Sequence, residues 1–129
     1  MLKKTTPIIF SGLWITFSEF VRNELLFKSY WTEHYQSLNL TFETKPINGM
    51  FWMVWSFLLA FFLSKMLKKF SKLEAIGLTW LVAFVMMWIT IFNLQVLPIT
   101  LLIFAIPLSL LEVFIAGEIL LRTQKTDKK

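Results

Sequence analysis

The sequence predicts an all-α membrane protein in which four transmembrane helices form one bundle, and three observations support this class. Hydrophobic residues make up 57% of the 129 positions and charged residues 16%, whereas soluble domains carry roughly 25% charged residues. The charges are gathered into short segments that separate four apolar blocks. When these blocks are placed across a bilayer, most basic residues fall on one side, as the positive-inside rule requires. We therefore expect residues 1–129 to form a single transmembrane domain.

The first helix is predicted over 5–27. Its apolar run begins after Lys3 and Lys4 and continues at helical spacing through Leu25 and Phe27. An apolar core of this length also fits a signal peptide, but no A-x-A-like cleavage site follows it. We expect an uncleaved helix, with cleavage as the alternative.

A short amphipathic segment is predicted over 29–37, lying along the membrane surface after the first helix. It contains Tyr30, Trp31, His34 and Tyr35 at helical spacing. Aromatic rings with polar tips are favoured at the boundary between lipid and water.

The other three helices are predicted over 46–67, 72–92 and 98–121. Pro46 and Pro98 suit the first positions of helices, and Ser71 and Glu74 form a capping box at the start of the third. At a rise of about 1.5 Å per residue, the helix over 46–67 is about 33 Å long, enough to cross a hydrocarbon core of about 30 Å. We expect residues 122–129 to be a disordered tail.

Basic residues predict the orientation of this bundle. Ten fall on one side and three on the other, so both termini should be cytoplasmic and the opposite end of the bundle should face the periplasm, the exterior or a lumen. A bacterial inner membrane is the location that we expect. The ten are Lys3, Lys4, Lys65, Lys68, Lys69, Lys72, Arg122, Lys125, Lys128 and Lys129, and the three are Arg22, Lys28 and Lys45.

Polar side chains at the outer end of the first helix form the main candidate site. Charges at a helix end have a plain explanation, in which they pair with one another or with lipid headgroups. The functional alternative is that this outer cluster lines a pocket for a small polar molecule or a lipid headgroup. Polar residues facing the inside of a bundle are often functional. The cluster consists of Glu19, Arg22, Asn23, Glu24, Trp31, His34 and Tyr35.

Glu112 is a second candidate because it is an isolated carboxylate inside the fourth helix. With Thr5 at the inner boundary and Pro98 at the outer one, Glu19 lies about 9 Å below the outer boundary and Glu112 about 9 Å from the cytoplasmic boundary. The same calculation places Arg22 and Glu112 about 17 Å apart in depth, too far for a direct ion pair. We expect Glu112 to be protonated or hydrogen-bonded to neutral groups, facing Ser11 of the first helix.

Small residues predict where helices pack closely. Gly12 and Thr16 lie on the polar face of the first helix, and Ser109 lies on the same face of the fourth helix as Glu112. Such stripes favour the close approach of two membrane helices. The stripe on the first helix therefore suits either a pocket or a partner helix.

Several functional classes are excluded or disfavoured by composition. The absence of cysteine excludes disulfides, thiolate metal sites and thiol nucleophiles. A single histidine without partners predicts no metal site, and no phosphate-loop, dinucleotide or zinc motif is present. The basic residues flank lipid-length segments, so we expect no nucleic-acid partner. We predict no catalytic residue and no cofactor.

Four short motifs interrupt the apolar blocks: Glu19-Phe20-x-Arg22-Asn23-Glu24, Lys28-x-Tyr30-Trp31-x-x-His34-Tyr35, Asn48-Gly49 and Ile106-Pro107-x-Ser109. Laid over the transmembrane region, they resemble small four-helix bacterial integral membrane proteins of unknown function. The resemblance implies a size and a hydropathy pattern, with no reaction or substrate attached.

Three function classes follow. The first is a non-enzymatic accessory or assembly subunit that docks partner helices, with the lipid bilayer and other membrane subunits or further copies of this chain as partners. The second is a small transporter or channel using Glu19 and Glu112 as proton or cation stations. The third is a membrane enzyme acting on lipid at the outer surface, with His34 or Glu19 as base.

Overall fold

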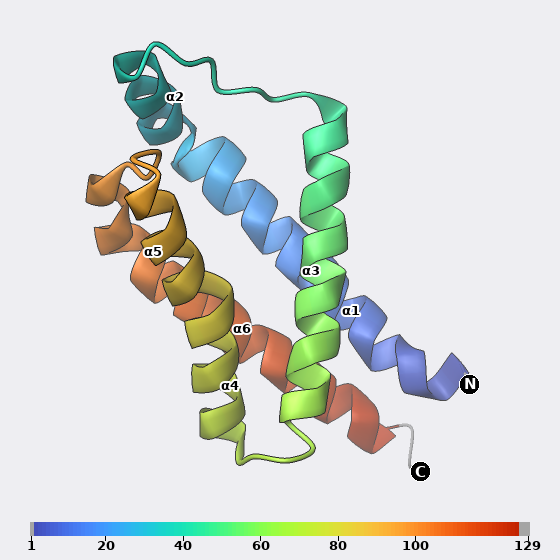
Figure 1. The fold of residues 1–129 in the computed structure, drawn as a ribbon. Coiled ribbons are helices and arrows are strands. Elements are labelled where there is room, and N and C mark those ends of the chain that lie inside the picture. The colour runs from blue at the N-terminus through green and yellow to red at the C-terminus, as the bar shows by residue number, and fades with distance from the viewer. Residues whose placement is uncertain (1, 127–129) are drawn as a thin grey trace.

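The computed structural model describes the backbone of residues 2–126 and the side chains of residues 5–124. Within this part of the chain all regular structure is helical and there is no strand (Figure 1). The elements are α1 (Leu2–Phe20), the π-helical segment η1 (Val21–Leu26), α2 (Lys28–Ser37), α3 (Pro46–Met66), α4 (Lys72–Trp80), the π-helical segment η2 (Leu81–Val85), α5 (Met86–Asn93), the 3₁₀ turn η3 (Ile99–Leu101) and α6 (Leu102–Thr126).

Among the described residues, three helical runs are long and apolar enough to cross a membrane: Pro46–Met66, Lys72–Asn93 and Ile99–Gln124. The second run joins α4, η2 and α5 into one rod, and the third joins η3 to α6. Segments of this length and hydropathy are favourable in hydrocarbon because a helix satisfies all its own backbone hydrogen bonds. The predicted class, an all-helical protein compatible with a membrane, is confirmed at this level.

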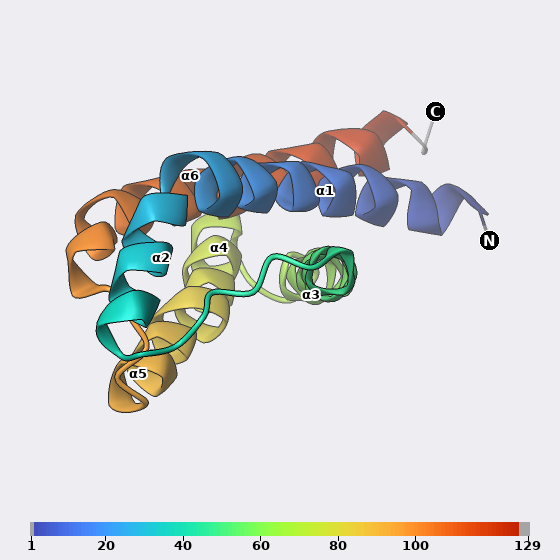
Figure 2. The same cartoon turned by 90° about the horizontal axis from the view of Figure 1, so that it is seen from above.

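The helices form two layers. Figure 2 shows α1 and α6 side by side in one layer, with α3 and the α4–α5 rod in the other. α1 contacts both α3 and α6, so it joins the two layers. The fully buried apolar side chains lie between them, and the largest are Phe84, Ile15, Leu63, Leu101 and Leu120.

Local signals fix several helix boundaries. Pro46 lies in the first turn of α3, and the capping box predicted before α4 is present. The Ser71 backbone N–H donates to Glu74 Oε2 at 3.0 Å, which satisfies a donor that has no partner inside the helix.

The C-terminal tail differs from the expectation. We expected residues 122–129 to be disordered, but α6 continues to Thr126, and residues 127–129 lie outside the described part. Two interactions with the preceding turn extend the helix: Arg122 Nε lies 3.3 Å from Glu118 Oε2, and the Thr123 hydroxyl donates to the Ile119 carbonyl at 2.7 Å.

The π-helical segment η1 separates α1 from α2. The Phe27 N–H donates to the Arg22 carbonyl at 2.9 Å, five residues back instead of the usual four. This wide turn places Arg22 inside the molecule, and α2 then leaves α1 in a different direction (Figure 2).

Candidate functional site: a buried ion cluster between α1 and α6

Three ionisable side chains meet between the two helices of the first layer. Glu19 comes from the end of α1, Arg22 from η1 and Glu112 from the middle of α6. The Arg22 Nη2 group donates to Glu19 Oε1, and Nη1 lies 3.1 Å from Glu112 Oε2. Glu19, Arg22 and Glu112 are 3%, 6% and 1% exposed, so one guanidinium holds two carboxylates inside the protein.

Neutral donors also bind one oxygen atom of each carboxylate. Asn23 Nδ2 donates to Glu19 Oε2 at 2.8 Å, and the Ser18 hydroxyl donates to Glu112 Oε2 at 2.7 Å. The Trp31 indole N–H donates to Asn23 Oδ1 at 3.3 Å and so connects α2 to the cluster. Hydrogen bonds to ionised groups are stronger than neutral ones, and this network therefore fixes α1, α2 and α6 relative to one another.

An aromatic ring covers the guanidinium on the side of the second layer. The carbon atom at the centre of the Arg22 guanidinium lies 5.0 Å from the centroid of the Phe84 ring, which belongs to η2. Phe84 in turn packs against Trp55 and Trp88. The two π-helical segments therefore face each other through a cation–π contact.

The charge balance of this cluster is uneven. With all three groups ionised, two carboxylates and one guanidinium carry one net negative charge. Glu112 Oε1 has no hydrogen-bond partner among the described residues. An uncompensated charge away from water costs several kcal/mol. One proton or one monovalent cation would neutralise the cluster.

The expectation that Arg22 and Glu112 lie too far apart to pair was wrong. We also expected Glu112 to face Ser11, but the Ser11 hydroxyl donates to the Ala116 carbonyl at 3.2 Å, one turn further along α6. The predicted register was therefore offset by about one turn, or about 6 Å.

Side-chain direction closes the rest of the gap between Arg22 and Glu112. Helical side chains lean toward the N-terminus of their own helix. α1 and α6 are antiparallel, so the Arg22 and Glu112 side chains lean toward each other. A depth calculated from the backbone rise alone leaves out this convergence of the two side chains.

The structure divides the predicted outer cluster. Glu19, Arg22, Asn23 and Trp31 join the network with Glu112, but the other three residues lie elsewhere. The Glu24 carboxylate lies 3.4 Å from the Lys28 ammonium, His34 Nε2 lies 2.8 Å from the Gln95 carbonyl oxygen, and Tyr35 packs on Trp31 and Phe42. His34 and Glu19 therefore belong to separate networks.

The predicted packing residues make contacts within the chain. A Cβ atom on Gly12 would lie 2.7 Å from Phe57 Cδ1, so Gly12 lets α1 approach α3 closely. The Thr16 hydroxyl donates to the Gly12 carbonyl at 2.8 Å. Ser109 accepts a hydrogen bond from the Trp80 indole N–H at 2.8 Å and so joins α6 to α4.

Sequence reasoning missed two members of the cluster. Ser18 lies seven residues after Ser11 and four before Arg22, so the helical period places all three near one face of α1, and this spacing was the available signal. Phe84 is one of fourteen phenylalanines in the chain, and nothing in the sequence distinguishes it from the others.

No group of three or more His, Cys, Asp or Glu residues that could hold a metal ion occurs within the described residues. No family model, curated protein or solved structure matches the chain. The geometry of the cluster is therefore the basis for interpreting its function.

Proposed function

We propose that the chain is an integral membrane protein of four transmembrane helices, with α1 and η1 together as the fourth span. α1 packs against α3 and α6, which belong to two of the three membrane-length runs. The described ends of α1 and α6 and the turn between α3 and α4 lie toward the same end of the molecule (Figure 1). Together with the distribution of lysines, this supports cytoplasmic termini, and we propose a bacterial inner membrane as the location.

Within this protein, the cluster of Glu19, Arg22 and Glu112 acts as a proton or cation site of a small transporter or channel. The supporting observation is that two buried carboxylates share one guanidinium. Binding a proton neutralises one carboxylate and leaves Arg22 paired with the other. A proton on Glu112 leaves Arg22 paired only with Glu19 of its own helical run, and its release restores the ion pair to α6, so occupancy is linked to the α1–α6 contact.

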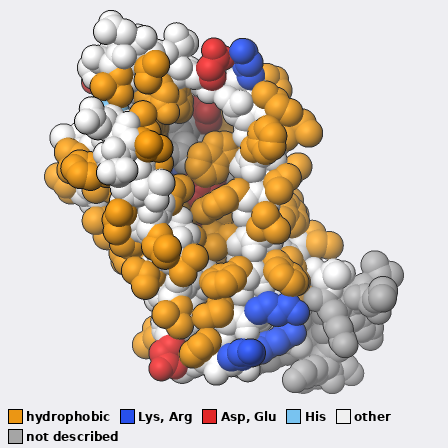
Figure 3. Space-filling view, viewed as in Figure 1, with side chains coloured by type: hydrophobic (Ala, Val, Ile, Leu, Met, Phe, Trp, Pro, Cys, Tyr) orange, Lys and Arg blue, Asp and Glu red, His pale blue; other side chains and the backbone are white. Residues whose placement is uncertain are grey.

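The surface supports access to this region. Figure 3 shows a hollow between α3 on one side and α2 and α5 on the other, with acidic side-chain atoms visible inside it. Ionisable groups that line an intramembrane cavity are typical of ion and proton pathways.

Flux in liposomes tests this function. Purified protein would be reconstituted with a pH-sensitive dye inside the vesicles, and proton uptake would be measured after an imposed potential. We expect uptake above that of protein-free vesicles, and Glu112→Gln and Glu19→Gln should reduce it to the protein-free rate. Glu24→Gln is the matched control, because Glu24 lies on η1 but pairs with Lys28 outside the cluster. Equal uptake by all four proteins would overturn the proposal.

Infrared spectroscopy gives an independent measurement of the same site. A carboxylic acid and a carboxylate absorb at different frequencies, so a titrating buried carboxyl group appears as a difference band between acidic and basic pH. We expect Glu112→Gln or Glu19→Gln to remove one band that persists in Glu24→Gln. A cluster that only holds the helices together would show no such band.

A second candidate function is the accessory subunit, and the exposure of α3 favours it. No residue of α3 before Ser56 is buried, and Phe51 and Met50 are 70% and 59% exposed. This half of α3 is free to contact lipid or the helices of a partner. Stoichiometric co-purification of another membrane protein, lost in Phe51→Ala but kept in Glu24→Gln, would support this function over transport.

A further inference from the structure

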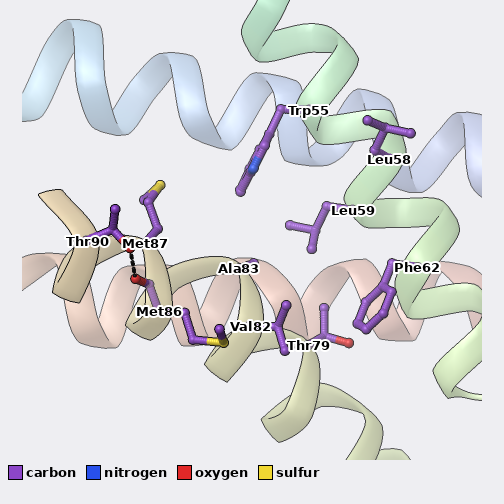
Figure 4. Close-up of a pocket in the computed structure, with 10 residues that line it drawn as sticks. All are labelled: Trp55, Leu58, Leu59, Phe62, Thr79, Val82, Ala83, Met86, Met87 and Thr90. Atoms are coloured by element: carbon purple, nitrogen blue, oxygen red, sulfur yellow. Dashed lines mark hydrogen bonds between the residues drawn. The ribbon is translucent and has the colours of Figure 1, made fainter.

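A groove on the lipid-facing side of the second layer shares no lining residue with the ion cluster. It lies between α3 and the α4–α5 rod and has a volume of about 370 Å³, near the lower end for small-molecule sites. Figure 4 shows Trp55 and Phe62 of α3 on one wall, with Thr79, Met86 and Met87 on the other.

The lining is apolar except for two hydroxyl groups and the Trp55 indole N–H. The Thr90 hydroxyl already donates to the Met86 carbonyl at 2.9 Å. The Thr79 hydroxyl is different, because Thr79 is 0% exposed and its oxygen has no hydrogen-bond partner among the described residues. A buried hydroxyl without a partner costs roughly 1–3 kcal/mol, so a ligand that supplies an acceptor gains affinity there.

Depth restricts the class of ligand. Thr79 is seven residues after Lys72, the start of a membrane-length run, so it lies about 10 Å along that helix. Thr90 is about 16 Å further along. The ester carbonyls of a phospholipid lie at the edge of the hydrocarbon, whereas the acceptor required at Thr79 lies inside it. The groove therefore fits a neutral lipophile that carries its oxygen into the membrane interior.

We propose that this groove binds a quinone-class lipophile, with a ring carbonyl accepting a hydrogen bond from the Thr79 hydroxyl and the chain extending toward Thr90. Phe62 and Trp55 offer aromatic surfaces to the ring and the chain. The methionine side chains adapt to an irregular apolar ligand. The proposal concerns binding only and needs no electron transfer.

Binding of decylubiquinone to the protein in lipid nanodiscs tests the inference. Quinones quench tryptophan fluorescence, and Trp55 lies in the groove, so saturable quenching reports occupancy. We expect Thr79→Val to weaken binding about tenfold, the effect of one hydrogen bond of about 1.4 kcal/mol. Thr79→Ser, which keeps the hydroxyl, should retain the affinity.

Thr90→Val is the matched control. It removes a hydroxyl from the same groove, but that hydroxyl already donates to the Met86 carbonyl. It should bind as tightly as the unaltered protein. Equal affinity in Thr79→Val and Thr90→Val would overturn the proposal, as would quenching that never saturates. Competition by a phosphatidylcholine with brominated chains, equally strong in Thr79→Val, would assign the groove to phospholipid chains and also overturn it. None of these outcomes depends on proton flux through the ion cluster.

Discussion

Two glutamates on α6, six residues apart, show how burial changes the role of the same chemical group. Glu112 is 1% exposed and shares the Arg22 guanidinium with Glu19. The Glu118 side chain is 26% exposed and pairs with two cations, Lys72 and Arg122. The buried cluster of Glu19, Arg22 and Glu112 therefore has more acidic than basic groups. The surface cluster of Glu118, Lys72 and Arg122 has more basic than acidic groups.

The difference between them is energetic as well as geometric. A buried ion pair contributes little net stability, but removing one partner is costly because the other charge stays away from water. An exposed pair is screened by solvent and salt, so its loss changes little. We infer that the buried cluster constrains the register of α1 against α6, whereas the surface pairs extend the end of α6 and join it to the start of α4.

The largest effect should follow the loss of the shared cation. Arg22→Met keeps an unbranched apolar stem but removes the guanidinium and leaves two buried carboxylates without a cation, so we expect a loss of about 3–5 kcal/mol in the free energy of unfolding. Denaturant titration in mixed detergent micelles measures it. Adding Glu19→Gln and Glu112→Gln to Arg22→Met should recover much of the loss, since no charge then remains buried. Failure to recover would show that Arg22 acts through packing instead.

The next-largest loss of stability should come from packing between α1 and α3, which involves no charge. Gly12→Ala places a methyl group 2.7 Å from Phe57 Cδ1, and overpacking of this kind costs about 1–3 kcal/mol. Gly49→Ala is the control, because nothing beyond its chain neighbours and the backbone of its own helical turns lies within 4 Å of the added carbon and alanine favours a helix. The same denaturant titration should place Gly12→Ala below the unaltered protein and Gly49→Ala at or above it. Equal stability of the two variants would mean that α1 and α3 adjust freely.

A smaller loss of stability is expected when a neutral hydrogen-bond donor of the buried cluster is removed. Ser18→Ala removes the hydroxyl that donates to Glu112 Oε2 at 2.7 Å. Hydrogen bonds to charged groups contribute about 1.5–3 kcal/mol, and the nearby Arg22 limits the loss to the lower part of this range. A double-mutant cycle with Glu112→Gln should show coupling between the two positions. Additive effects would place Ser18 outside the network.

The smallest effect is expected at the surface ion pairs of Glu118 with Lys72 and Arg122. Arg122→Met removes one of the two cations on Glu118, and we expect no measurable change in the unfolding midpoint because the Arg122 side chain is 83% exposed. The measurement should be repeated at high salt, where the variant and the unaltered protein should still coincide. A loss as large as that of Arg22→Met would remove the distinction between the two clusters.

Hydropathy and local capping predicted much of the secondary structure. The helix over 46–67 appears as α3, and the capping box at Ser71 starts α4. These features depend on residues close together in the chain, and the sequence contains the information directly. The extension of α6 to Thr126 was missed because side-chain pairing with the preceding turn outweighed the polarity of the segment.

The centre of the candidate site was harder to predict, although its residues were named. Arg22 and Glu112 are ninety positions apart, and their contact depends on how far α1 slides along α6. That offset is fixed by tertiary contacts such as Ser11 with Ala116 and the Trp14 indole N–H with the Glu112 carbonyl. Hydropathy defines where a helix enters and leaves lipid only to within a turn, and one turn decided whether these charges meet.

The five-residue hydrogen bond between Phe27 and Arg22 has a consequence for the rest of the chain. Each residue of an α-helix turns the chain by about 100°, so shortening this segment by one position would swing α2 around the axis of α1. Trp31 would then point away from Asn23, and His34 would leave the turn at Gln95. The extra residue in this π-helical turn therefore sets the direction in which α2 leaves α1 and reaches the turn at Gln95.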